Sequence, residues 1–420
     1  MDYKKYEFDG YNAHFIKTNR FKSIYISFVL INEFNKENLT KNFILRKLLT
    51  TSSKKLKNEV EVTREVSKLY NSGLVVSNDI IGNSIVTTFD MEVLEDRYTE
   101  DGLLKKALTY FFDTIFYPNI IDKKFEKENY DLAISSAKLY YESQKENKNK
   151  YAVDNAYLLM DDEFLKYDIN GYAKDLDNIT RENMVTYYND LIKSANANIF
   201  MIGSFDDDNV LKIINKNLDS KVFKNDNYSR SITFTDKPEL KEKEDIETNN
   251  QSILVMLYKI LNATKREKNV IFPIFNRIFG GSDNSKLFKV VREENSLCYD
   301  IGSTISRSGV VRVQSGISYE NKEKVKKLID EQLKKMKNGN ISDKEFNEAI
   351  VFRRRALKQF EDYNDSILYL KEGNVLFESD DIDERMEHLN SVKKEEIIEL
   401  SKKIVLNVVY MLKGDTDEKD

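Results

Sequence analysis

The chain has 420 residues, of which 40% are hydrophobic and 11% aromatic, so it can bury a sizeable interior, and its length predicts two to four domains. Its 66 Lys and Arg residues against 71 Asp and Glu residues give a net charge of −5, which argues against a nucleic-acid surface built on a basic excess. Cys298 is the only cysteine, and the sequence has neither an apolar signal core at its start nor a run of about 18 apolar residues. We therefore expect a cytoplasmic protein that binds neither nucleic acid nor membrane.

Within each half of the chain, strands are interspersed with long paired helices. Strands are expected where Val, Ile, Phe and Thr cluster, at 23–31, 75–93, 198–205, 252–260, 309–318 and 408–414. A helix is expected at 322–337, where apolar residues recur at helical spacing, and Ser342 with Glu345 predicts a capping box at the start of another. This pattern predicts an α+β fold, with helices packed over one face of a mainly antiparallel sheet.

Four pairs of similar segments occur in the same order along the chain. They are 64–70 with 292–299, 122–125 with 343–346, 178–185 with 391–398, and 197–208 with 407–417. Four colinear matches predict a duplication into two homologous half-domains. We expect the first half-domain to span 1–233 and the second 252–420, with the charged stretch 234–251 as the linker.

The segment 278–299 reads IFGGSDNSKLFKVVREENSLCY. Together with the strand endings at Gly203 and Gly414 and an expected helix at 122–138, it resembles the pitrilysin/insulinase family of zinc peptidases over almost the whole chain. The resemblance implies two α+β half-domains that face each other as one part of a clamshell. It also implies a second chain, which closes with this one around unfolded peptide.

Active members of that family carry H-x-x-E-H on a helix of the first half, where two histidines bind zinc and the glutamate activates water. The matching helix here is 39–56, in which Asn42, Leu45 and Arg46 occupy the positions of the first histidine, the glutamate and the second histidine. A further glutamate ligand is matched by Ser135. These side chains offer zinc no usable donor set, so the resemblance implies a degenerate site that holds no metal.

The second-half signature is retained as Arg292 and Tyr299. In the family these two residues point across the chamber at substrate held near the partner's zinc, so the resemblance implies that they bind substrate in trans. It implies a non-catalytic, peptide-binding subunit with no cofactor of its own. The partner is a homologous chain with H-x-x-E-H, or a second copy when the chain is isolated. Within such bacterial heterodimers, the chain resembles the inactive member of a Gram-positive pair associated with elongation factor P modification.

Other interpretations remain open at this point. Arg292 and Tyr299 could be an ion-paired helix residue and a core tyrosine at a strand start. The chain could also be a proteolytically inert scaffold, like the respiratory-complex core subunits that share the fold, or an active enzyme with an unrecognised site. His14 and His388 are lone histidines and are expected to be structural, and Cys298 is expected to be a buried, inert thiol.

Overall fold

The computed structural model describes every residue except 219–220, 222, 225–231 and 416–420. It contains two compact units, each described separately below. The first unit comprises residues 1–143, 168–230 and 362–372, and the second comprises 144–167, 231–361 and 373–420. Both units therefore contain segments from both halves of the sequence.

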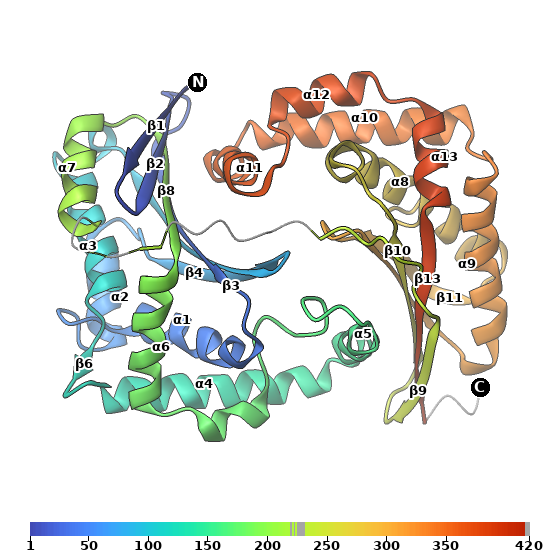
Figure 1. Ribbon diagram of the computed structural model, residues 1–420, viewed down its shortest axis with the longest axis horizontal. Helices are drawn as coiled ribbons and strands as arrows, with labels where there is room; N and C mark the ends of the chain where they lie inside the picture. Colours follow the sequence, from blue (N-terminus) through green and yellow to red (C-terminus); the bar gives the residue numbers. More distant parts are fainter. Residues whose placement is uncertain (219–220, 222, 225–231, 416–420) are drawn as a thin grey trace. The chain divides into compact units, whose positions relative to one another are not determined.

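The helices and strands follow the order labelled in Figure 1. The strands are β1 (Asp2–Phe8), β2 (Tyr11–Lys17), β3 (Ser23–Glu33), β4 (Val75–Ile81), β5 (Ser84–Leu94), β6 (Ile120–Ile121), β7 (Lys124–Phe125), β8 (Asn196–Gly203), β9 (Lys241–Glu247), β10 (Ser252–Ile260), β11 (Cys298–Ile305), β12 (Val310–Ile317) and β13 (Ile404–Gly414). The α-helices are α1 (Leu39–Thr51), α2 (Glu59–Lys68), α3 (Leu103–Phe116), α4 (Lys127–Glu146), α5 (Lys148–Leu158), α6 (Arg181–Ser194), α7 (Asp207–Leu218), α8 (Phe272–Phe279), α9 (Lys322–Lys337), α10 (Asp343–Phe360), α11 (Asn364–Phe377), α12 (Ile382–Asn390) and α13 (Lys394–Lys402). Short 3₁₀ or π turns are η1 (Lys36–Asn38), η2 (Asp96–Tyr98), η3 (Ala173–Asn178), η4 (Glu267–Ile271), η5 (Phe288–Glu294) and η6 (Tyr319–Asn321).

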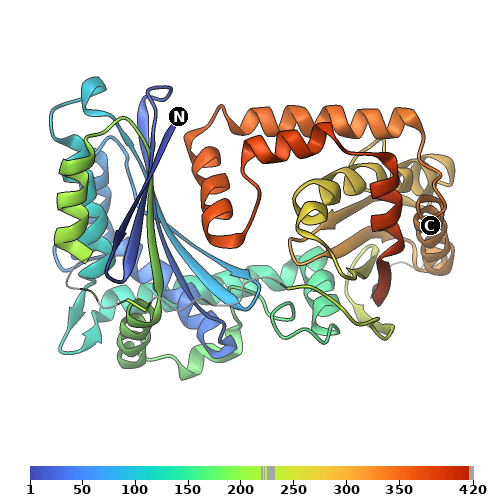
Figure 2. The ribbon, with the colours of Figure 1, turned by 45° about the horizontal axis from the view of Figure 1, so that its top comes forward.

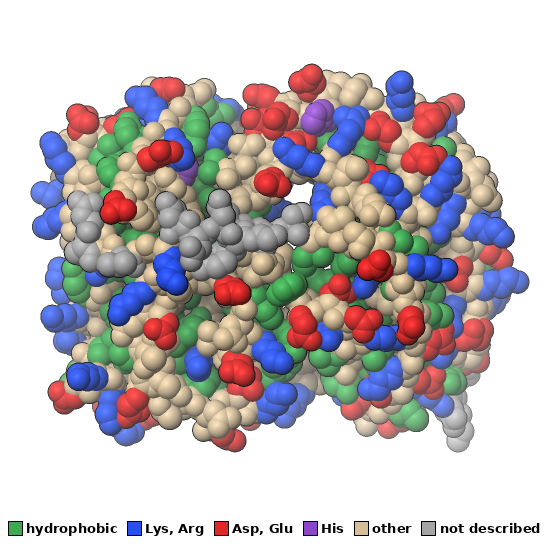
Figure 3. All heavy atoms as spheres, in the orientation of Figure 1, with side chains coloured by type: hydrophobic (Ala, Val, Ile, Leu, Met, Phe, Trp, Pro, Cys, Tyr) green, Lys and Arg blue, Asp and Glu red, His purple; other side chains and the backbone are tan. Residues whose placement is uncertain are grey.

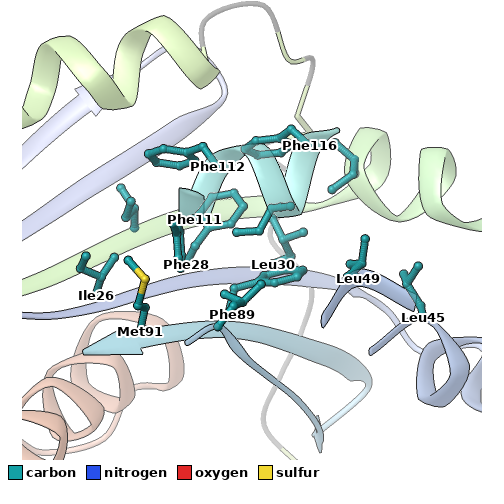
Figure 4. Close-up of a cluster of buried hydrophobic side chains, with 14 of the residues drawn as sticks. Ile26, Phe28, Leu30, Leu45, Leu49, Phe89, Met91, Phe111, Phe112 and Phe116 are labelled. Atoms are coloured by element: carbon teal, nitrogen blue, oxygen red, sulfur yellow. The ribbon is translucent and has the colours of Figure 1, made fainter. Parts of the chain in front are cut away.

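The described part of the first unit is built on a six-stranded sheet with the order β1-β2-β8-β3-β5-β4. Only β2 and β8 pair in parallel, and the other neighbours are antiparallel. One face of this sheet carries the main core, where α3 places Phe111, Phe112 and Phe116 over Phe28 and Phe89 (Figure 4). Helices α3 and α7 lie on this same side of the sheet (Figures 1 and 2).

The described part of the second unit has a five-stranded sheet with the order β11-β12-β10-β13-β9. Its central strand β10 is buried along its whole length, because helices cover both faces. On one face, residues from α8, α9, α10, α12 and α13 pack against Leu254, Met256 and Tyr258. Helix α10 begins with the predicted capping box, in which Ser342 and Glu345 bond each other's backbone N–H groups.

The two sheets have matching topology. The order β2-β8-β3-β5-β4 corresponds strand by strand to β9-β13-β10-β12-β11, and in each sheet the last strand in sequence pairs in parallel with the first of these five. Gly203 and Gly414 end the equivalent strands β8 and β13. This correspondence supports the inferred duplication, and the α+β fold with mainly antiparallel sheets is confirmed.

Some local expectations differ from the structure. Residues 122–125 form a turn with positive φ at Asp122 and Lys123 followed by β7, whereas residues 343–346 begin α10, so this pair is not equivalent. Helix α4 accordingly begins at Lys127 rather than at residue 122. Part of the expected linker 234–251 is strand β9, which pairs with β13. The half-domain limits 1–233 and 252–420 stay a prediction.

Each sheet has a second covering helix that comes from the other half of the sequence. Helix α5 packs Ala152 and Ala156 against the β10 face that carries Val255 and Leu257, within the second unit. In the first unit, the start of α11 lies on the sheet face opposite the main core, where the Asn364 amide donates to Ser23 Oγ at 3.0 Å and to Glu92 Oε1 at 3.1 Å. This exchange explains why the compact units interleave in sequence.

Candidate functional site

Helix α1 carries the positions expected to correspond to the lost zinc motif, and it ends at Thr51 rather than at residue 56. Leu45 is part of the main core and is 2% exposed. Asn42 is also buried, and its side-chain amide has no hydrogen-bond partner among the described residues. Arg46 follows one turn later on the same helix face and is half-buried.

A cluster of aromatic and amide side chains surrounds Arg46. Its guanidinium carbon lies 4.7 Å from the centroid of the Phe43 ring, and Nη2 donates to Asn170 Oδ1 at 2.5 Å. The Asn170 amide in turn donates to the Tyr140 hydroxyl at 2.9 Å, and the Tyr141 hydroxyl donates to the Asn170 carbonyl at 2.5 Å. We call these five residues the Arg46 cluster.

The loop before η3 anchors the Arg46 cluster to the start of α1. Gly171 has φ of +69°, and a Cβ at this position would come within 2.0 Å of Thr40 Oγ1. The same Thr40 hydroxyl donates to Asp175 Oδ2 at 2.7 Å and accepts from the Tyr172 N–H at 3.0 Å. Only glycine fits this close approach, so Asn170 is held in place by its own loop.

The structure does not bring Ser135 to this cluster. Ser135 is exposed on α4, between the buried residues Ala133 and Ala137. The side chains of α4 that reach the Arg46 cluster are Tyr140 and Tyr141, more than a turn further along. Sequence reasoning missed these tyrosines and Asn170, and the only signal nearby was the Asn170–Gly171 turn dipeptide.

The residues at the α1 positions do not fit a zinc ion. Zinc needs imidazole, thiolate or carboxylate donors, whereas an amide, an alkyl group and a guanidinium stand here. Within the described ranges, no group of three or more His, Cys, Asp or Glu side chains is arranged to hold a metal. We therefore derive no zinc chemistry from this chain.

The second-half signature lies on the edge of the second sheet. Arg292 is in η5, exposed, with its guanidinium carbon 4.6 Å from the centroid of the Phe288 ring. Ser296 then adopts φ of +51°, and the pairing of β11 with β12 shifts register between Cys298 and Asp300. Tyr299 lies at this irregularity and is 83% exposed, so the interpretation of Tyr299 as a core tyrosine is wrong.

The remaining polar residues singled out in the sequence have structural surroundings. His14 is fully buried, contacts the Tyr3 hydroxyl at 2.9 Å and stacks on Phe200, and burial lowers its pKa to about 4. His388 Nδ1 lies 2.9 Å from Asp380 Oδ2. Cys298 is half-buried, and this burial raises the pKa of its thiol.

Comparison with known proteins shows which proteins this chain is similar to. A family profile described as "Peptidase M16 inactive domain" matches residues 178–350, which include Arg292 and Tyr299 but not α1. The "Probable inactive metalloprotease YmfF" of Bacillus subtilis is 28% identical, with 96% of each chain covered. A conserved protein from Enterococcus faecalis has the same fold at 24% identity, with a TM-score of 0.93 and full coverage of both chains. The "peptidase M16 inactive domain" from Pseudomonas fluorescens has a TM-score of 0.78 at 14% identity, with 100% and 99% of the two chains covered.

The fold is thus that of M16-type peptidases, and the second half of the chain is similar to a domain described as inactive in that family. The chain is a homologue of the probable inactive metalloprotease of Bacillus subtilis, which confirms the resemblance and the prediction of a degenerate zinc peptidase. Among the described helices, none is both long and apolar enough to cross a bilayer. On the face drawn in Figure 3, basic and acidic side chains are interspersed.

Proposed function

We propose that this chain is the non-catalytic, peptide-binding subunit of a zinc peptidase-like heterodimer. The observation that carries the proposal is the exposure of Arg292 and Tyr299 at the start of an edge strand, in a chain whose α1 has no zinc donors. Two polar side chains held at full exposure add nothing to a core. They are, however, available to a ligand or a partner chain.

The chemistry of the two side chains fits substrate handling. The Tyr299 hydroxyl can donate a hydrogen bond to a peptide carbonyl oxygen as negative charge develops on it, a contribution of about 3 kcal/mol to lowering a barrier. Arg292 presents a planar fork of donors that suits a carbonyl or a carboxylate. Phe288 supports the guanidinium by a ring contact, so the fork has a preferred orientation.

The proposal requires a partner of specific chemistry. The partner is a homologous chain with H-x-x-E-H, which alone holds zinc and activates water. The single cysteine fits a reducing compartment, so we place the pair in the cytoplasm. A role linked to elongation factor P modification is the cellular process that the sequence resemblance adds to this proposal.

The test begins with capture of the native complex and sequencing of the partner. We expect a chain with H-x-x-E-H, and elemental analysis should find about one zinc per heterodimer and none in the isolated chain. A partner without that motif would leave a proteolytically inert scaffold as the better function.

The second stage measures cleavage of an unfolded peptide by the reconstituted pair. Arg292→Ala and Tyr299→Phe should each slow cleavage about ten- to a hundredfold while gel filtration shows intact assembly. Arg292→Lys should not restore the full rate, because a point charge cannot reproduce the planar fork. Exposed Arg355 and Tyr363 give matched controls, and Arg355→Ala and Tyr363→Phe should leave the rate unchanged. Equal rates in all variants would contradict the in-trans role.

A further inference from the structure

The charge of Arg46 has no direct ion pair among the described residues, although the Asp168 carboxylate is near enough to attract it. Its guanidinium contacts the Phe43 ring and Asn170, but no described carboxylate lies within ion-pair distance of it. Burial lowers the pKa of Arg46, which means that the surroundings disfavour its charge. A partly desolvated cation is costly unless an anion or several hydrogen bonds compensate it.

Another arginine of the same chain shows the usual compensated arrangement. Arg266, in the second unit, has a side chain that is 31% exposed, and its Nε donates to Glu396 Oε1 at 2.7 Å. That pairing raises the pKa of Arg266, opposite in direction to the shift at Arg46. Arg46 is thus a half-buried arginine that contacts an aromatic ring and one amide but makes no ion pair within the described residues. The nearby Asp168 carboxylate attracts its charge without offsetting the effect of burial on its pKa.

The Arg46 cluster also holds its guanidinium in place. Asn170, which accepts from Arg46, donates through its backbone N–H to Asp168 Oδ1 at 2.8 Å and through its amide to Tyr140. A guanidinium has five N–H donors, and the hydrogen bond to Asn170 uses one of them. Because the side chain is already oriented, little conformational entropy is lost when the remaining donors bind a ligand.

A second unsatisfied polar group lies one helical turn away. Asn42 is 1% exposed, and neither its amide nitrogen nor its amide oxygen has a hydrogen-bond partner in the described part of the chain. Positions i and i+4 of a helix are neighbours on one face, so this amide lies close to the guanidinium. Buried amides normally have hydrogen-bond partners. On this face of α1, the Asn42 amide and the remaining N–H groups of Arg46 therefore offer hydrogen bonds that no described residue uses.

We propose that Arg46 binds a carboxylate of a peptide ligand, at the position on α1 where active relatives carry a zinc-ligating histidine. The planar fork matches a carboxylate bidentately, and a bound carboxylate would supply the direct ion pair that Arg46 lacks among the described residues. The carboxylate is either the C-terminus of the peptide or an acidic side chain within it. The inference rests on the proposed function only in taking a peptide as the ligand, and it requires neither zinc nor a partner.

The test uses the purified full-length chain alone and three fluorescent ten-residue peptides of otherwise identical, uncharged sequence. One has a free C-terminal carboxylate, one has a C-terminal amide, and one has a C-terminal amide and an internal glutamate. Fluorescence anisotropy should show that at least one carboxylate peptide binds about tenfold more tightly than the neutral amide. Comparison of the two carboxylate peptides identifies the source of the anion.

Substitutions then assign the effect to Arg46. Arg46→Gln should abolish the difference between carboxylate and amide peptides, and Arg46→Lys should restore only part of it. Arg64 on α2 is exposed and makes no ion pair within the described residues, so Arg64→Gln is the matched control and should keep the full difference. Equal affinity of the wild-type chain for all three peptides, or no binding of any, would overturn the proposal without using a variant. An equal loss in Arg64→Gln would overturn it too.

The outcome is separable from that of the proposed function. Loss of carboxylate preference in Arg46→Gln, with partner-dependent cleavage still sensitive to Tyr299→Phe, would support both inferences independently. If the wild-type chain showed no preference for carboxylate peptides, the Arg46 site would be refuted and the proposed heterodimer function would be unaffected.

Discussion

The two sheets of this molecule share a strand order. The helices exchanged between the halves of the sequence, α5 and α11, cover sheet faces that differ in polarity. Helix α5 lies on an apolar face, where Ile253, Val255 and Leu257 surround Ala152 and Ala156. The start of α11 lies on a mixed face, which carries the polar residues Ser27, Asp90 and His14 beside buried apolar residues such as Val29 and Phe200. Duplication thus preserved the topology but not the chemistry of helix docking.

The face under α11 brings two acidic groups close together. Glu372, at the end of the first-unit segment, is 9% exposed. Burial raises its pKa to about 8, the Ser27 hydroxyl opposes this shift, and the nearby Asp90 carboxyl adds to it. Burial likewise raises the pKa of Asp90 to about 6. Docking of α11 is therefore sensitive to protonation, whereas docking of α5 depends on apolar contact.

The largest expected effect comes from placing a charge where α5 packs on the apolar face of its sheet. We call the sheet face that a helix covers the seat of that helix. Ala156→Asp would bury a carboxylate among apolar side chains against β10, and we expect a loss of about 3–5 kcal/mol in the free energy of unfolding. Urea denaturation followed by circular dichroism measures this loss. Leu158 is 47% exposed on the same helix, so Leu158→Asp should cost less than about 1 kcal/mol. Similar losses of unfolding free energy in both variants would show that α5 does not exclude water from the apolar face of the sheet.

The second test uses the pH dependence of the α11 seat. The folded chain keeps the proton of Glu372 up to about pH 8, while the unfolded chain loses it near pH 4.5, so Glu372 lowers stability progressively between these values. Glu372→Gln removes this penalty and should stabilise the protein by about 2–4 kcal/mol at pH 8 and by little at pH 4.5. Glu128→Gln, at an exposed position of α4 in the same unit, is the control and should leave the pH profile of stability unchanged. If the stability difference between Glu372→Gln and the wild-type chain were the same at pH 4.5 and pH 8, protonation of Glu372 would not explain it.

The smallest expected effect concerns the polar anchor of α11. Asn364→Ala removes the hydrogen bonds to Ser23 and Glu92 and the one that the Asp365 N–H donates to Asn364 Oδ1, and it should cost about 1–2 kcal/mol in the urea experiment. Glu92→Gln keeps an acceptor in the same place and should cost less than about 0.5 kcal/mol if charge contributes little. A cost for Asn364→Ala as large as that for Ala156→Asp would contradict the difference between the two seats.

The sequence predicts those parts of the fold that depend on local pattern. Alternation and β-branched residues predict the core strands, and Ser342 with Glu345 predicts the start of α10. Strand β9 is missed because its sequence, KEKEDIE, is dominated by charge, which an edge strand tolerates but strand propensity disfavours. The exchange of α5 and α11 is missed because no local pattern says which sheet a helix will cover.

In the candidate site, too, local sequence pattern predicts some residues, and others are determined only by tertiary contacts. Motif position along the chain locates Asn42, Leu45 and Arg46 on one helix, and Arg292 and Tyr299 beside an edge strand. The link from Arg46 to Asn170 joins residues 124 positions apart, and no spacing rule predicts it. Ser135 fails as a site residue because helix phase turns it outwards, while Tyr140 and Tyr141 face the cluster.

The polar character of the α11 seat also has a consequence for synthesis on the ribosome. The strands of the first sheet end at Gly203, long before Asn364 is translated, so one face of that sheet stays uncovered during most of elongation. Asp90, Ser27 and Asn198 lie among the apolar residues of this face, and these polar groups reduce the apolar surface that is exposed during this delay. Helix α5, by contrast, is complete before β10 emerges, so the apolar face of the second sheet meets its cover as soon as it forms.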